Sequence, residues 1–295
     1  MSADAIVGWD GYLSLVRPPA SRSFDWHILA EGDSWFHFGF APRPGKPRNL
    51  LDPLKFEKST VIVSFALSGD TIKHISKPGS NPELLQAMAY RKWNLILLSA
   101  GGNDLIDALV GDGNYKIGGQ PIAILKPAPA GSHFMEYINL DALQLLLDFI
   151  DLYYHRFAAL RESEGGRINR DTRIVSHCYD YITARNAPAV FGPLKLGPWA
   201  YEAFTNPKYN IPNDQNQWKF VTEYLFERLA ERLQRLATSS IPNMTVINTL
   251  DTLNPAKPGT TGRSGDWANE IHPNPDGYTK LADQKISPVL ASLLS

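Results

Sequence analysis

The sequence predicts an α/β fold in which a parallel sheet of five strands lies between two layers of helices. Two observations lead to this prediction. Short runs of apolar and β-branched residues recur along the chain, as is typical of strands buried on both faces. Longer segments with apolar residues at helical spacing separate these runs. The five expected strands are residues 27–31, 60–66, 93–99, 171–177 and 244–248.

Helices are expected between and after these runs. One begins near residue 82 and ends near 91, because Asn81 can cap its first turn and Pro82 suits the first helical position. Residues 140–160 and 215–236 carry apolar side chains at intervals of three and four, and a last helix is expected over 276–294. Since helices alternate with strands, right-handed crossovers should cover both faces of the sheet.

Composition limits the classes of function. The 295 residues include 29 Lys and Arg against 30 Asp and Glu, so no net charge favours nucleic acid or an anionic membrane as a partner. The single cysteine, Cys178, excludes an intramolecular disulfide. The seven histidines form no His-x-x-x-His or Glu-x-x-His pair, so we expect no metal and no other cofactor. Without a signal peptide or a spanning apolar stretch, a cytoplasmic protein is expected.

We expect one domain over residues 1–295, because the motifs described below would otherwise be divided between two. Residues 1–26 show no clear period and should form an N-terminal extension. Glycine and proline gather in residues 110–135, an insertion that either covers the cleft or faces solvent. A second insertion over 186–213 is rich in aromatic residues, which suit contact with a sugar or an acyl chain but equally pack on their own domain.

The first expected strand leads into Gly-Asp-Ser at residues 32–34. This places the Ser34 hydroxyl just beyond the carboxyl end of a buried strand, where ligands bind in open parallel sheets. Gly-Asp-Ser is also common in turns, so it indicates a nucleophile only if further motifs of an active site follow in the chain. A proline-rich loop over residues 36–53, including Pro42 and Pro44, is expected beside this serine.

Three companion motifs follow in order. Gly69 comes after the second expected strand, Asn103 after the third, and His272 before the last helix. With Ser34, these residues resemble the four name-giving blocks of the SGNH (GDSL-type) hydrolase superfamily over residues 31–278. The resemblance implies a three-layer α/β/α sandwich with the flavodoxin-like strand order 2-1-3-4-5.

The resemblance also implies roles that acyl transfer requires. Ser34 would attack the ester, and His272 would act as general base and then as general acid. The oxyanion would be bound by the backbone N–H groups of Ser34 and Gly69 and by the Asn103 side-chain amide. Gly69 lets a substrate oxygen approach the backbone closely because it has no Cβ.

One position departs from the family pattern. The family usually has Asp three residues before the histidine, and this chain has Asn269. An asparagine oxygen can orient the imidazole but cannot neutralise the imidazolium. We hypothesise that Asn269 orients His272 and that Asp266 supplies the missing charge; Glu270 is the alternative carboxylate, and a Ser-His dyad without a third member is the other possibility.

Further residues are candidates for the cleft. Asp180 and Tyr181 follow the fourth expected strand and are candidate substrate-binding residues. His37 lies three residues after Ser34 and is interpreted as a loop histidine. No Gly-x-Ser-x-Gly elbow is present, which argues against the α/β-hydrolase fold.

These observations favour a serine-dependent esterase or lipase-like hydrolase that acts on a small-molecule or glycan ester through an acyl-enzyme. A carbohydrate O-acetylesterase is the alternative within the enzymes, and a non-catalytic ester- or glycan-binding module is the alternative outside them. A histidine base with its ordinary pKa predicts a rate that rises between about pH 6 and 7.

Overall fold

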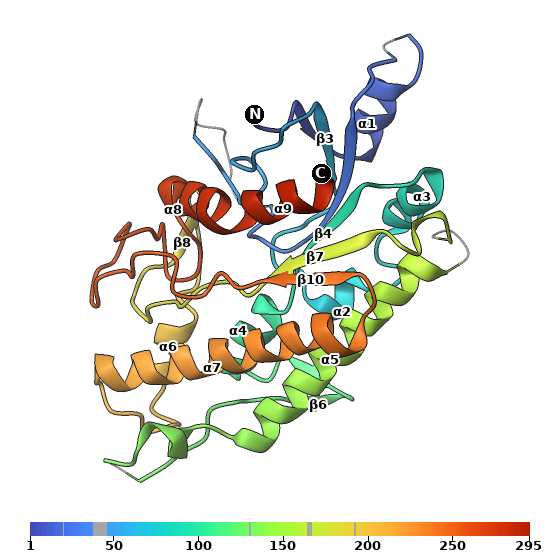
Figure 1. Cartoon of the computed structure of the whole chain (residues 1–295). Helices are drawn as coiled ribbons and strands as arrows, with labels where there is room; N and C mark the ends of the chain where they lie inside the picture. Colours follow the sequence, from blue (N-terminus) through green and yellow to red (C-terminus); the bar gives the residue numbers. More distant parts are fainter. Residues whose placement is uncertain (20, 38–45, 130, 164–166, 192) are drawn as a thin grey trace.

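The computed structural model describes residues 1–19, 21–37, 46–129, 131–163, 167–191 and 193–295. At its centre is a six-stranded, fully parallel sheet with the order β1-β3-β2-β4-β7-β10 (Figure 1). Its strands are β1 (Ala5–Val7), β2 (Trp26–Gly32), β3 (Thr60–Ser64), β4 (Leu95–Ser99), β7 (Arg173–His177) and β10 (Met244–Ile247).

The fold class and strand order predicted from the sequence are confirmed. The five expected strands are β2, β3, β4, β7 and β10, and they lie in the order 2-1-3-4-5. The strand count was wrong by one, because β1 pairs with β3 at the edge of the sheet, with Ala5 opposite Val61. This strand is part of the expected N-terminal extension, and three residues are too few to show a period.

Helices lie on both faces of the sheet. Figure 1 shows α8 (Pro275–Leu281) and α9 (Ser287–Leu294) above it and α5 (Leu140–Glu162) and α7 (Gln215–Arg235) below it. As predicted, the Asn81 side chain caps α3 (Pro82–Tyr90) by accepting a hydrogen bond from the Leu84 N–H. The other helices are α1 (Trp9–Val16), α2 (Ile72–Ile75), α4 (Gly102–Val110) and α6 (Ala200–Thr205), with 3₁₀ turns at Phe134–Tyr137 and Arg167–Asn169 and π-helical turns at Leu236–Ser240 and Ala282–Ile286.

Both expected insertions contain short regular elements. The first carries a hairpin of β5 (Lys116–Ile117) and β6 (Gln120–Pro121). The second carries a hairpin of β8 (Ala189–Phe191) and β9 (Leu194–Leu196), followed by α6. Much of the proline-rich loop expected beside Ser34, including Pro42, Pro44 and Gly45, lies outside the described residues.

The sheet positions the candidate site through its buried first strand. All seven residues of β2 are buried, and the strand ends at Gly32 against β4. A Cβ at Gly32 would lie 2.7 Å from the backbone oxygen of Ser99, so only glycine allows the two strands to approach this closely. Because the strands are parallel, the segments that follow β2, β3 and β4 meet at one edge.

Candidate active site

Ser34 and His272 are in direct contact although 238 positions separate them in the chain. The distance from Ser34 Oγ to His272 Nε2 is 2.8 Å. Ser34 lies in the turn after β2, whereas His272 lies in the loop that leads into α8. This is the hydrogen bond that a serine nucleophile and its general base require.

Asn269 determines which nitrogen of His272 carries the proton. Its Oδ1 accepts hydrogen bonds from the backbone N–H groups of Ile271 and His272, at 3.0 and 2.9 Å. Two N–H donors at one atom identify that atom as the amide oxygen, because an NH₂ group would face them donor to donor. The same oxygen lies 3.0 Å from His272 Nδ1, so Nδ1 is protonated. His272 Nε2 is therefore left as the acceptor for the Ser34 hydroxyl.

The imidazole of His272 is buried, with 4 % of the residue exposed. Burial disfavours the charged ring and lowers the pKa of His272 to about 3. The side chain of Asn269 is uncharged and does not oppose this shift. His272 is consequently neutral at ordinary pH and available as a base.

The predicted oxyanion donors Ser34, Gly69 and Asn103 follow strands β2, β3 and β4. Among the described residues, the backbone N–H groups of Ser34 and Gly69 have no hydrogen-bond partner. Gly69 has a φ of +89°, a conformation that favours glycine, and nothing lies within 4 Å of where its Cβ would be. The Asn103 amide donates one N–H to the backbone oxygen of Asp70, at 2.9 Å, and has a second N–H.

A small recess adjoins Ser34 and Asn103. Its volume is about 20 Å³, which is little more than one water molecule requires. The recess has mainly apolar walls, formed by Trp35, Ile106, Tyr179, Ile182, Phe226 and Ile271. A short acyl group fits this space better than a long chain does.

A buried polar network lies beneath the nucleophile, and the sequence analysis did not anticipate it. Asp33 Oδ1 accepts from the Trp35 N–H and the Ser99 hydroxyl, and its Oδ2 accepts from the Tyr179 hydroxyl. Burial raises the pKa of Asp33 to about 6. His177 Nε2 lies 3.0 Å from Ser99 Oγ. These bonds fix the backbone that presents Ser34; the polar residues at strand ends are the only sequence signal of them.

Of the two carboxylates considered beside Asn269, Asp266 contacts Lys280. Its Oδ2 accepts from the Asn254 N–H at 2.7 Å and lies 3.3 Å from Lys280 Nζ. These contacts link two stretches of the loop to α8.

Glu270 is fully buried and accepts hydrogen bonds from the backbone N–H groups of Arg185, Trp199, Ala200 and Tyr201. It therefore ties the second insertion to the loop that carries Asn269 and His272. Burial raises the pKa of Glu270 to about 7.

The two candidate substrate-binding residues have different surroundings. The carboxylate of Asp180 accepts from four backbone N–H groups, those of Tyr181, Asp251, Thr252 and Leu253, and so holds the segment after β10. The Tyr181 hydroxyl lies 3.3 Å from Glu227 Oε1, and its ring lines a cavity of about 270 Å³ that does not include Ser34. The recess beside Ser34 contains neither of them.

Two solved structures with a similar fold are lipases. A lipase from a goat rumen metagenome is 14 % identical to the chain, with a TM-score of 0.51 over 91 % of this chain and 98 % of that one. An extracellular lipase from Streptomyces rimosus is 12 % identical, with a TM-score of 0.50 over 91 % and 99 %. The chain therefore shares its overall fold with these two lipases. No protein-family model and no curated protein matches the sequence.

In the part of the chain that the structure describes, no helix is both long and apolar enough to cross a membrane.

Proposed function

We propose that the protein is a serine-dependent carboxylic ester hydrolase that works through an acyl-enzyme. The observation that carries the proposal is the continuous hydrogen-bonded series from Ser34 Oγ to His272 and on to Asn269 Oδ1. The fold is consistent with it, as are the backbone N–H groups of Ser34 and Gly69, which have no partner among the described residues.

In the proposed reaction, Ser34 Oγ attacks the ester carbonyl carbon while His272 Nε2 takes the hydroxyl proton. The negative charge that develops on the carbonyl oxygen is stabilised by the N–H groups of Ser34, Gly69 and Asn103. Collapse of the tetrahedral intermediate breaks the bond to the alcohol, which leaves with the proton from His272. A water molecule, activated by the same imidazole, then hydrolyses the acyl-enzyme.

The third member of this hydrogen-bonded arrangement is the amide Asn269 rather than the usual carboxylate. It orients the ring and fixes its tautomer, but it provides no negative charge for the imidazolium that forms at each proton transfer. The proposal therefore assigns Asn269 a positioning role. Any effect of Asp266 on the imidazolium would come from its carboxylate charge, which Lys280 Nζ, 3.3 Å from Oδ2, partly offsets.

The proposal is tested by treating the protein with diethyl p-nitrophenyl phosphate. The expected result is one diethyl phosphoryl group on Ser34, found by peptide mass spectrometry, together with loss of p-nitrophenyl acetate hydrolysis. Ser99→Ala is the matched control and should still be labelled, because the Ser99 hydroxyl is fully buried. An unlabelled wild-type protein that hydrolyses no ester would instead support a non-catalytic binding module.

A further inference from the structure

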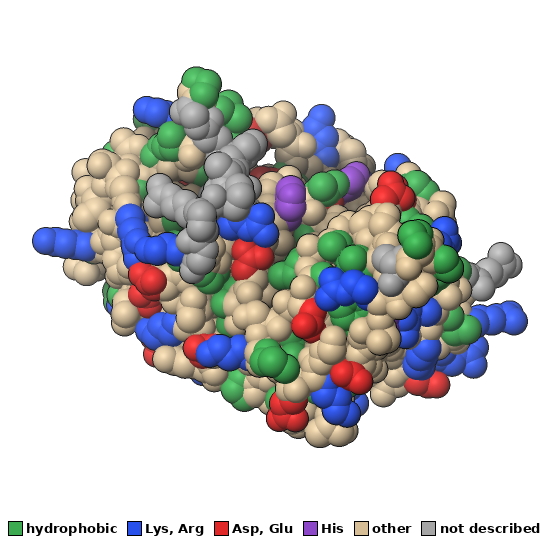
Figure 2. All heavy atoms as spheres, turned by 90° about the horizontal axis from the view of Figure 1, so that it is seen from above, with side chains coloured by type: hydrophobic (Ala, Val, Ile, Leu, Met, Phe, Trp, Pro, Cys, Tyr) green, Lys and Arg blue, Asp and Glu red, His purple; other side chains and the backbone are tan. Residues whose placement is uncertain are grey.

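A larger cavity opens at the carboxyl ends of β1, β2 and β3, and the mechanism above makes no use of it. Its volume is about 640 Å³, within the range of small-molecule sites. Figure 2 shows a hollow on this side of the molecule with histidine side chains at its margin. The cavity adjoins the candidate active site through two segments, because His37 lies three residues after Ser34 and Asp70 directly follows Gly69.

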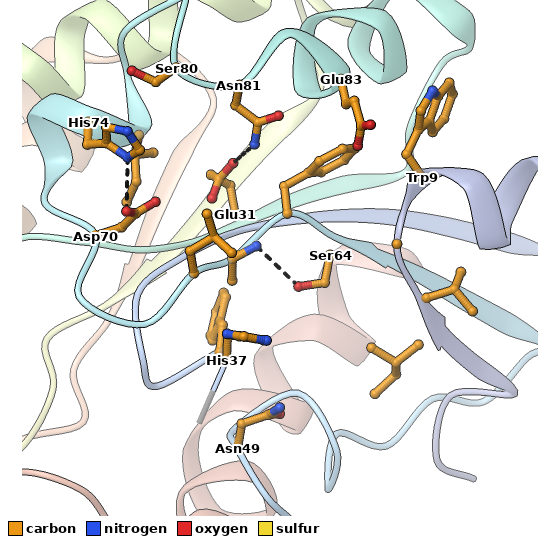
Figure 3. A pocket seen from close by; sticks show the side chains of 18 of the residues that line it. Trp9, Glu31, His37, Asn49, Ser64, Asp70, His74, Ser80, Asn81 and Glu83 are labelled. Atoms are coloured by element: carbon orange, nitrogen blue, oxygen red, sulfur yellow. Dashed lines mark hydrogen bonds and ion pairs between the residues drawn. The ribbon is translucent and has the colours of Figure 1, made fainter. Parts of the chain in front are cut away.

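Hydrogen-bonding side chains enter the cavity from several elements (Figure 3). Glu31 at the end of β2 accepts from Asn81 Nδ2 at 3.0 Å, and Asp70 lies 2.9 Å from His74 Nδ1. An alkyl chain in this space would remove these groups from water without replacing their hydrogen bonds. The remaining polar and charged side chains on the walls are those of His37, Arg48, Asn49, Ser64, Ser80 and Glu83.

The charges around the cavity disfavour an anion. Asp70 and Glu83 line it, and the Arg48 guanidinium is paired with Asp52 at 3.1 Å. Among the described lining residues there is no lysine. Burial raises the pKa of Glu31 well above its ordinary value, which favours a neutral carboxylic acid that can donate a hydrogen bond.

Apolar groups complete the walls. The rings of Trp9, Phe36 and Phe65 and the side chain of Ile75 line the cavity together with the polar groups. Mixed walls of this kind match a ligand that has both C–H faces and several hydroxyl groups. They match neither a fatty acyl chain nor a phosphorylated compound.

We infer that this cavity binds a sugar, which forms the alcohol half of the ester, while a short acyl group occupies the recess beside Ser34. The inference rests on the proposed function. The segment from Gly69 to Asp70 lies between the two spaces, since the Asp70 side chain lines the cavity and its backbone oxygen accepts from Asn103, which lines the recess. An ester carbonyl at Gly69 would then direct its two substituents to opposite sides.

The test fills the cavity and leaves the recess unchanged. Ser80→Trp places an indole in the cavity, Ser80→Ala is the matched control, and Glu83→Trp fills it from an exposed position on the first turn of α3. The two tryptophan variants should raise KM for 6-O-acetyl-D-glucose about tenfold or more and change kcat/KM for p-nitrophenyl acetate less than about threefold. Retained p-nitrophenyl acetate hydrolysis shows that each variant is folded.

Calorimetric titration of Ser34→Ala with 6-O-acetyl-D-glucose separates the two proposals, because it measures binding without turnover. Binding that Ser80→Trp weakens in this background supports the sugar site. Equal binding with and without Ser80→Trp overturns it, even if Ser34 is the nucleophile. Two other outcomes would also overturn it. If Ser80→Trp selectively weakens the binding of acetylcholine, the cavity takes a cationic alcohol. If it selectively weakens the binding of p-nitrophenyl octanoate, the cavity takes an acyl chain.

Discussion

Two serine–histidine pairs in this molecule have nearly the same contact and opposite proton arrangements. Ser34 Oγ lies 2.8 Å from His272 Nε2, and Ser99 Oγ lies 3.0 Å from His177 Nε2. Both imidazoles are buried, and burial lowers the pKa of each to about 3. Contact distance and pKa therefore do not distinguish a candidate catalytic pair from a structural one.

The two histidines differ in the hydrogen-bond partner of Nδ1. His272 Nδ1 donates to Asn269 Oδ1, so Nε2 carries no proton and accepts the hydrogen bond of the Ser34 hydroxyl. His177 Nδ1 accepts the backbone N–H of Tyr179, so its proton is on Nε2 and points at Ser99. The Ser99 hydroxyl in turn donates to Asp33. His177 consequently cannot act as a base toward its serine, and its network stabilises the turn that carries Ser34.

The largest expected effect is the contrast between alanine substitutions at the two serines. Ser34→Ala should lower kcat for p-nitrophenyl acetate by about 10⁴-fold, because it removes the nucleophile. Ser99→Ala should lower kcat less than about tenfold, since Ser99 touches no substrate. Steady-state kinetics of both variants measure this. A comparable loss in both would show that the second pair also takes part in the reaction.

The next effect concerns the group that fixes the tautomer of His272. Asn269→Ala should lower kcat by about 10²-fold or more, because the ring loses its orienting acceptor. Asn269→Asp keeps an acceptor in place for the N–H groups of Ile271 and His272 and adds a negative charge beside Nδ1. Its kcat should equal or exceed that of the wild type. If Asn269→Ala retains full activity, a Ser-His dyad describes the site.

The pH dependence of kcat/KM tests the protonation state of His272. A histidine with a lowered pKa is neutral, and hence an active base, at every pH above that pKa. The kcat/KM of the wild type should therefore be flat from about pH 8 to pH 5 and fall only in stronger acid, rather than between pH 6 and 7. Asn269→Asp should move this fall to higher pH, because a carboxylate favours the imidazolium. A wild-type profile with a midpoint near 6.5 would contradict the burial argument.

A stability measurement tests whether the Ser99–His177 pair has a structural role. His177→Phe keeps an aromatic ring beside Trp35 but removes the acceptor for the Tyr179 N–H and the donor to Ser99. The unfolding free energy should fall by about 1–3 kcal/mol per buried group left unpaired, as measured by urea denaturation. The kcat should change less than about threefold. A large loss of kcat without loss of stability would give His177 a role in the reaction.

The smallest effect is expected at Asp266. Asp266→Ala removes a carboxylate that is already paired with Lys280 and bonded to the Asn254 N–H. We expect kcat to fall less than about twofold. Lys280→Ala is the matched control for the lost ion pair. A larger loss of kcat in Asp266→Ala than in Lys280→Ala would show that the Asp266 charge reaches the imidazolium.

The sequence was sufficient to predict the main elements of the fold and the members of the candidate site. Apolar runs alternating with amphipathic segments predicted five strands of the parallel sheet, since burial on both faces is a local property of the side chains. Three of the four residues Ser34, Gly69, Asn103 and His272 follow expected strands, and the resemblance to the SGNH hydrolases grouped all four in one candidate site. The roles of these residues remain predictions, as does that of Asn269.

Other features depend on contacts between distant parts of the chain, and only the tertiary structure decided them. Strand β1 is too short to show a period and exists because β3 offers an unpaired edge. The tautomers of His272 and His177 follow from the groups that the fold places at Nδ1. The same holds for the cavity beside Glu31, whose walls come from four separate stretches of chain. Local patterns determine which elements form, whereas proton positions and cavities arise only where those elements meet.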